Sequence, residues 1–123
     1  MKRIIIDLDD TICRTFNGDY QNSSPIWEVI EKIRAYKEQG FEIAIHTSRN
    51  MRTYSGNLGK INANTLPIII DWLERHEVPY DEIYAGKPWC GTEGFYVDDR
   101  SVRPDEFSKL TYKEICRLIK IEK

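Results

Sequence analysis

A short run of isoleucines near the N-terminus, in segment 3–8, places the strongest constraint on the fold. Its apolar residues fall on both faces of an extended chain, which is typical of a strand in the middle of a parallel sheet that helices cover on both sides. Strand-like and helix-like segments then alternate along the chain, a pattern that predicts an α/β domain with a mainly parallel central sheet. We expect the strands at residues 3–8, 41–46, 83–85 and 94–97.

Apolar residues at helical spacing predict three helices between and after these strands. The first begins with Ser24 as its N-cap and ends before Gly40. The second covers residues 67–76, and the third begins at Thr111, where Glu114 completes a capping box. The apolar face of the first helix consists of Ile26, Val29, Ile30, Ile33 and Tyr36.

Three stretches fit no predicted helix or strand, and each follows the end of a predicted strand. They are residues 12–23, 47–66 and 87–93. In open parallel sheets, ligands bind at the edge where the strands end. The middle stretch is long for a loop in a compact domain, and loops of that length are usually functional or disordered.

Length and composition exclude several classes of protein. A chain of 123 residues is long enough for one domain, which we expect to span residues 1–123. A formal net charge of -2 gives no basic footprint for nucleic acid or an anionic membrane. No apolar run approaches the roughly 20 residues of a membrane span, and the N-terminus turns acidic too soon for a signal peptide. Three widely spaced cysteines indicate reduced thiols in a cytoplasmic protein.

Two carboxylates follow the first predicted strand, in the sequence Asp7-Leu8-Asp9-Asp10-Thr11. We expect Asp7 and Asp9 to lie close together at the strand tip, where their like charges repel. Such a pair needs a cation, or one member must hold a proton. Mg²⁺, a hard dication that prefers oxygen ligands, meets that need. An acidic turn would contain the same residues, so this motif alone leaves both interpretations open.

Polar residues also follow each of the other predicted strands. Thr47, with Ser48 and Arg49 after it, follows the second strand and carries a hydroxyl that can donate to a phosphoryl oxygen. Lys87 follows the third strand and could place a positive charge against a developing oxyanion. The pair Asp98–Asp99 follows the fourth strand and could add metal ligands. A surface lysine or an Asp-stabilised turn would also explain each motif alone, so their conjunction carries the argument.

In this order and strand context, the four motifs resemble those of the haloacid dehalogenase-like (HAD) superfamily of phosphohydrolases. The matching residues, in motif order, are Asp7, Asp9 and Thr11, then Thr47, then Lys87, then Asp98 and Asp99. The resemblance covers nearly the whole chain. It implies a three-layer Rossmann-like fold with a mainly parallel central sheet.

The HAD resemblance also implies a mechanism with an aspartyl-phosphate intermediate. Asp7 would attack the phosphorus of a monoester, while Asp9 would protonate the leaving oxygen and later take a proton from the attacking water. Thr47 and Lys87 would orient and neutralise the transferred phosphoryl group. The Mg²⁺ ligands would be a carboxylate oxygen of Asp7, the backbone carbonyl of Asp9 and the pair Asp98–Asp99, either member of which could be the direct ligand.

Many HAD proteins carry a cap domain between the first and second motifs or between the second and third. In this sequence each of those gaps holds only a loop and a predicted helix, which is too little for a domain of about 50 residues. We therefore expect no cap domain. The site would then be open to a bulky substrate, or a second subunit of a homo-oligomer could close it.

A nearer but less specific resemblance is to small bacterial phosphatases of capsule and surface-polysaccharide biosynthesis. It rests on the stretches DLDDTIC, HTSRNM, GKPWCG and FYVDDRSVRP. The resemblance implies a phosphorylated sugar or a saccharide precursor as the substrate.

The loop at residues 47–64 contains three basic residues and no acidic residue. We expect it to replace the cap and to grip the anionic or sugar portion of the substrate, with Tyr54 and Trp89 available to stack on a sugar ring. A solvated loop surface with locally packed aromatic residues is the alternative. The predicted substrate-binding residues are Thr11, Ser48, Arg49, Arg52, Lys60 and Trp89.

The sequence thus predicts a cytoplasmic, Mg²⁺-dependent phosphomonoesterase that acts on a small, sugar-derived phosphate. A phosphatase for nucleic-acid ends is an alternative, although the slightly acidic charge argues against it. A non-catalytic binding protein on the same fold is another, and the competent residues at all four motifs argue against that. Transfer of the phosphoryl group to an acceptor other than water is disfavoured by an open site.

Overall fold

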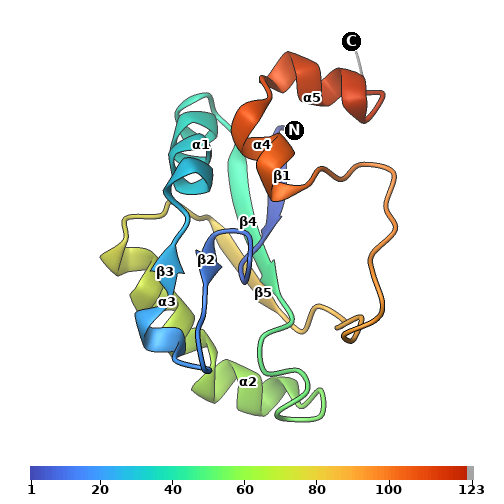
Figure 1. Cartoon of the computed structure of the whole chain (residues 1–123). Coiled ribbons are helices and arrows are strands. Elements are labelled where there is room, and N and C mark those ends of the chain that lie inside the picture. The colour runs from blue at the N-terminus through green and yellow to red at the C-terminus, as the bar shows by residue number, and fades with distance from the viewer. Residues whose placement is uncertain (122–123) are drawn as a thin grey trace. The chain divides into compact units, whose positions relative to one another are not determined.

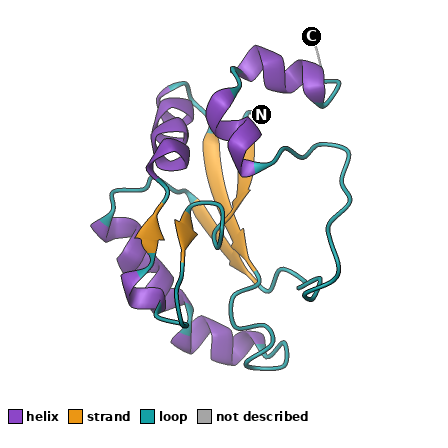
Figure 2. Cartoon of the chain, in the orientation of Figure 1, coloured by secondary structure: helices purple, strands orange, loops and turns teal. Residues whose placement is uncertain are grey.

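The computed structural model describes residues 1–121, which fall into two compact units, Met1–Trp89 and a second unit that begins at Cys90. The single core domain expected from the sequence remains a prediction. In the first unit the elements are β1 (Arg3–Asp7), β2 (Cys13–Arg14), η1 (Tyr20–Asn22), β3 (Ser24–Pro25), α1 (Trp27–Glu38), β4 (Glu42–Thr47), α2 (Leu58–Asn64), α3 (Leu66–Arg75) and β5 (Glu82–Ala85) (Figures 1 and 2). The second unit contains α4 (Pro104–Lys109) and α5 (Tyr112–Leu118).

The main sheet of the first unit has the strand order β1-β4-β5, and both pairs of neighbours are parallel. Its central strand, β4, is the most deeply buried, and Ile43, Ala44 and Ile45 all lie in the core. Helix α1 packs against β4, and α2 packs against β5. Three of the four predicted strands and the mixed α/β class with a parallel sheet are therefore confirmed.

Helix α1 begins at Trp27, so the expected start at Ser24 is wrong. Ser24 and Pro25 instead form β3, which pairs with β2 in an antiparallel two-stranded sheet. The N-cap residue is Ile26, whose backbone N–H donates to the carbonyl of Ile12 at 2.8 Å. Tertiary pairing with the segment after β1 thus overrides the local capping preference of a serine. The expected apolar face and the end before Gly40 are confirmed.

Stretch 47–66 contains a helix that the sequence did not suggest. Helix α2 is capped by Asn57, whose side chain accepts a hydrogen bond from the backbone N–H of Lys60 at 3.2 Å. Ile61 is fully buried and anchors the helix. Ile61 is the one buried residue among these seven, which is too weak a pattern to predict a helix of this length, so the loop is shorter than expected.

The second unit also departs from the sequence prediction. Residues 94–97 form no strand, because an apolar segment becomes a strand only where a neighbour accepts its backbone hydrogen bonds. Helix α4 was not expected, whereas α5 begins as predicted. Its N-cap Thr111 accepts from the backbone N–H of Glu114 at 3.2 Å and donates its own N–H to the Glu114 carboxylate at 2.9 Å.

Strand β1 lies at the edge of the main sheet, whereas its sequence predicts a central strand. Ile6 is buried, but Ile5 is 56% exposed on the other face. Among the described residues, no helix has the length and apolar character needed to cross a membrane.

Two neighbouring isoleucines of α3 test where the core of the first unit lies. Ile69 is 1% exposed and Ile70 is 38% exposed. We expect Ile69→Ala to lower the free energy of unfolding by about 2–5 kcal/mol, because it leaves a cavity in a packed core. Ile70→Ala should lower it by less than about 1 kcal/mol, since surface substitutions cost little and alanine favours the helix. Urea unfolding followed by circular dichroism measures both, and equal losses would contradict this assignment of the core.

Candidate active site

Three of the residues predicted to be catalytic meet where β1, β4 and β5 end. Asp7 is the last residue of β1, Thr47 is the last of β4, and Lys87 lies two residues beyond β5. The backbone N–H of Lys87 donates to the carbonyl of Thr47 at 3.1 Å, and its Nζ lies 3.7 Å from Oδ1 of Asp7. The side chain of Asp7 is 34% exposed, so one side of the carboxylate remains open to solvent.

Burial is the main influence on the pKa of two ionisable groups at this edge. It raises the pKa of Asp7 and outweighs the ammonium group of Lys87, which lowers that pKa. His46 lies opposite Asp7 in the β1–β4 register. Burial lowers the pKa of His46, and the charge of Lys87 lowers it further, so the neutral imidazole is favoured.

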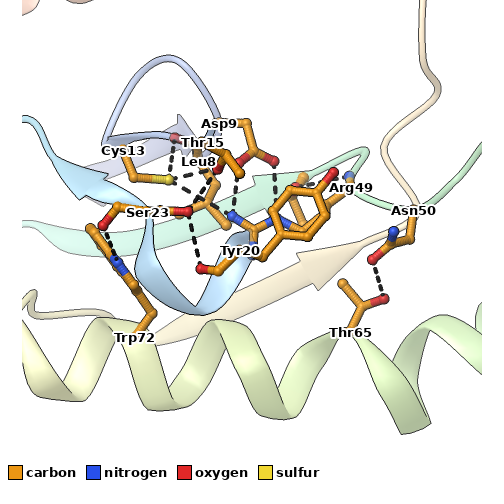
Figure 3. A network of polar contacts seen from close by, with 11 residues as sticks. Leu8, Asp9, Cys13, Thr15, Tyr20, Ser23, Arg49, Asn50, Thr65 and Trp72 are labelled. Atoms are coloured by element: carbon orange, nitrogen blue, oxygen red, sulfur yellow. Dashed lines mark hydrogen bonds and ion pairs between the residues drawn. The ribbon is translucent and has the colours of Figure 1, made fainter. Parts of the chain in front are cut away.

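Asp9 is held by Arg49, as Figure 3 shows. The guanidinium of Arg49 donates to both carboxylate oxygens of Asp9, from Nη2 at 2.7 Å and from Nε at 3.1 Å. The Arg49 side chain is only 3% exposed, and its guanidinium lies 4.2 Å from the ring centre of Tyr20. Its backbone N–H donates to Oγ1 of Thr47 at 3.0 Å. The guanidinium predicted to bind substrate is thus already engaged with an acidic side chain.

Sequence reasoning missed two neighbours of this ion pair, Cys13 and Tyr20. The thiol of Cys13 is buried, and its sulfur lies 3.7 Å from Oδ1 of Asp9. Burial raises the pKa of this thiol to about 12. It therefore stays protonated and unreactive at neutral pH. Both residues lie in or next to the small β2–β3 sheet, and no local sequence signal marks either one.

A cleft of about 410 Å³ opens beside Asp9 and Arg49. The guanidinium of Arg52 lies 5.7 Å from the ring centre of Trp89 and forms one side of the cleft. Thr11 and Lys60 are not among the described residues that line it. The lining residues are Asp9, Asp10, Thr15, Gly18, Tyr20, Ser48, Arg49, Asn50, Arg52, Thr53 and Trp89. A larger hollow of about 540 Å³ between α1 and the end of α3 contains none of the predicted site residues.

The oxygen donors expected to bind Mg²⁺ are divided between the two units. The Asp7 carboxylate and the Asp9 backbone carbonyl belong to the first unit, and Asp98 and Asp99 belong to the second. The described residues include no group of three or more His, Cys, Asp or Glu side chains that could hold a metal ion. Carboxylate and carbonyl oxygens are nevertheless the donors that Mg²⁺ prefers, so the donor types fit the ion.

The chain matches no protein-family model and no curated protein. Among solved structures, it is 57% identical to an MCSG target from Vibrio cholerae, covering 100% of both chains with a TM-score of 0.96. A chain in the Pnkp1/Rnl/Hen1 complex is 18% identical, with 88% of this chain and 34% of that chain covered and a TM-score of 0.52. D,D-heptose 1,7-bisphosphate phosphatase from B. bronchiseptica, complexed with magnesium and phosphate, is 15% identical over 98% of this chain and 64% of that one, with a TM-score of 0.47.

These matches bear on the fold and on the family. The likeness to the chain in the Pnkp1/Rnl/Hen1 complex, of which this chain spans about a third, supports the mixed α/β fold. The TM-score between this chain and the heptose bisphosphate phosphatase, 0.47, is too low to support a conclusion. Identity of 57% over the whole of both chains shows that this protein belongs to the same family as the Vibrio cholerae protein.

Two arginines of one loop test the structural importance of the Arg49–Asp9 pair. Arg49→Met leaves the Asp9 carboxylate without its buried partner, and we expect it to lower the free energy of unfolding by roughly 2–4 kcal/mol. Arg52 is exposed and stacks near Trp89, so Arg52→Met should cost less than about 1 kcal/mol. Chemical denaturation of both variants measures the difference. A cost for Arg49→Met no larger than that for Arg52→Met would contradict the inferred role.

His46 should make the stability of the protein depend on pH. Because its pKa is lowered in the folded state from 6.5, the unfolded chain takes up a proton first as the pH falls below 6.5. The free energy of unfolding should therefore decrease with falling pH in this window. His46→Gln removes that contribution, and its unfolding free energy should change less steeply between about pH 5 and 7. Parallel curves for the two proteins, in metal-free buffer, would contradict the lowered pKa.

Proposed function

We propose that this protein is a phosphomonoester hydrolase that depends on Mg²⁺ and forms an aspartyl-phosphate on Asp7. The observation that carries the proposal is the position of Lys87, whose Nζ is 3.7 Å from Oδ1 of Asp7 where three parallel strands end. A cation beside a partly exposed carboxylate favours the ionised, nucleophilic form and can also neutralise an incoming phosphoryl group.

In the first step, a carboxylate oxygen of Asp7 attacks the phosphorus and the ester P–O bond breaks. Asp9 gives its proton to the leaving oxygen, so the alcohol departs as a neutral group. The oxygen of Thr47 accepts from the Arg49 backbone N–H at 3.0 Å, which fixes a hydroxyl beside the reacting group. Lys87 offsets the negative charge on the phosphoryl oxygens.

In the second step, water attacks the phosphorus of the intermediate and gives a proton to Asp9. The bond between phosphorus and Asp7 breaks, which releases inorganic phosphate and restores both residues. Asp9 must therefore alternate between protonated and ionised forms while Arg49 keeps it in place. Arg49 acts through Asp9 and is a positioning residue in this scheme.

The metal would be held by the Asp7 carboxylate and the Asp9 carbonyl together with Asp98 or Asp99. When bound, Mg²⁺ would neutralise negative charge on the transferred phosphoryl group. The complete fold in this proposal has three layers and no cap domain.

A phosphorylated sugar or saccharide precursor fits the cleft beside Asp9. Tyr20 and Trp89 offer aromatic rings, and the exposed Arg52 offers a positive charge for an anionic substituent. Such a substrate agrees with the resemblance to phosphatases of surface-polysaccharide biosynthesis and with a cytoplasmic enzyme. Nucleic-acid ends and membranes are disfavoured by the net charge of -2.

Release of phosphate from an aryl phosphate, measured with Mg²⁺ and with EDTA, tests the reaction. The wild type should be active with Mg²⁺ only, and Asp7→Asn should reduce kcat by at least about 1,000-fold, because an amide is a poor nucleophile. Asp71→Asn, on the exposed face of α3, is the matched control and should retain full activity. Activity that survives in Asp7→Asn would refute the aspartyl-phosphate. A screen of sugar phosphates, nucleotides and phosphorylated RNA or DNA ends then separates the substrate classes.

A further inference from the structure

The outer edge of β1 has the properties of an incomplete sheet. In the part of the chain that the structure describes, β1 is paired with β4 alone. The strand is rich in isoleucine, and Ile5 is 56% exposed. A β-branched edge strand with an exposed apolar side chain readily pairs with another strand.

Residues 94–97, with the sequence Gly-Phe-Tyr-Val, have the complementary properties. They form neither helix nor strand, although aromatic and β-branched residues favour strands. Phe95 is 80% exposed and Val97 is 88% exposed, which is unusual for side chains of this size and so close together. We propose that this segment pairs, in parallel orientation, with the free edge of β1 in a second copy of the chain.

Charged residues have the same spacing around β1 as around residues 94–97. Lys2 lies five positions before Asp7, and Glu93 lies five positions before Asp98. A parallel register with Asp98 opposite Asp7 therefore sets Glu93 opposite Lys2, an attractive pair of opposite charges. An antiparallel register would set Glu93 against Asp7 and Asp98 against Lys2, so each direction contains one attractive and one repulsive pair. The parallel direction is the one that brings Asp98 to the same end of the strand as Asp7.

The length of the link identifies the second copy as the occupant. Only eight residues, 86–93, separate the end of β5 from the segment. A parallel strand in the same chain would require a return across the sheet, and such crossovers take a dozen or more residues, usually with a helix. The corresponding segment of a second copy faces no such limit, and twofold symmetry lets the two copies exchange segments reciprocally.

The exchange has a consequence for the active site, and this part of the inference rests on the proposed function. Pairing brings Asp98 and Asp99 of the second copy to the end of β1, beside Asp7. Each site would then take its nucleophile from one subunit and its acidic pair from the other. The oxygen donors of the first unit would then meet the acidic pair of the second copy.

Molar mass measured by size-exclusion chromatography with light scattering tests the exchange without reference to activity. The wild type should be a dimer, and the double variant Phe95→Asp/Val97→Asp should be a monomer with an unchanged circular dichroism spectrum in the far ultraviolet. Phe16→Asp is the matched control, since Phe16 is 67% exposed but lies outside the proposed interface, and it should remain dimeric. A monomeric wild type, or a double variant that remains dimeric, would overturn the inference.

Lengthening the link provides a second test that does not depend on the solubility of charged variants. Insertion of about eight Gly and Ser residues between Gly91 and Thr92 makes the link long enough for a crossover within one chain. The chain could then complete its own sheet, so we expect the insertion variant to be monomeric. An insertion variant with the same dimer affinity as the wild type would contradict the limit set by link length.

Mixing inactive variants tests the shared site. Asp7→Asn and Asp99→Asn should each be inactive alone, yet after unfolding and refolding together they should recover about a quarter of wild-type activity, because half of the dimers are mixed and each contains one intact site. No recovery, with an active dimeric wild type, would refute the shared site. If the wild type itself has no phosphatase activity, the proposed function fails while the mass measurements still decide the exchange.

Discussion

The candidate site depends on the parallel register of three strands. Because Asp7 lies opposite His46 and Thr47 lies opposite Ala85, β1, β4 and β5 end at one edge of the sheet. The residues that follow these strands therefore lie close together, and their positions do not depend on the ordering of a long loop. A slip of one residue in β1 would turn Asp7 to the other face of the sheet. The buried apolar side chains of β4 oppose such a slip, so core packing and site geometry depend on the same contacts.

The pair formed by Asp9 and Arg49 joins the segment after β1 to the segment after β4. Removing a guanidinium from water costs several kcal/mol, and the structure offsets this cost with two hydrogen bonds to Asp9 and with the ring of Tyr20. The contact fixes the orientation of the Asp9 carboxylate beside the cleft.

The sequence predicted most of the elements because their signals are local and strong. The isoleucines of β1 and the capping box at Thr111 need no tertiary information. The start of α1 was wrong because Ser24 pairs with Arg14, a contact between residues ten positions apart that outweighs a capping preference. Tyr20 was missed for a similar reason, since it reaches Arg49 only through the fold. Arg49 was correctly predicted to lie at the candidate site. Its burial against Asp9 could not be predicted, because a basic loop sequence does not show which of its side chains are buried.

The connection between β5 and residues 94–97 is short. It has eight residues and lacks the helix that a parallel crossover usually contains. The acidic pair after that segment therefore needs another route to the end of β1. Association of two copies supplies such a route and covers an apolar edge at the same time. Assembly of the site would then follow protein concentration, since each dimer must form before Asp7 and the acidic pair can share a metal.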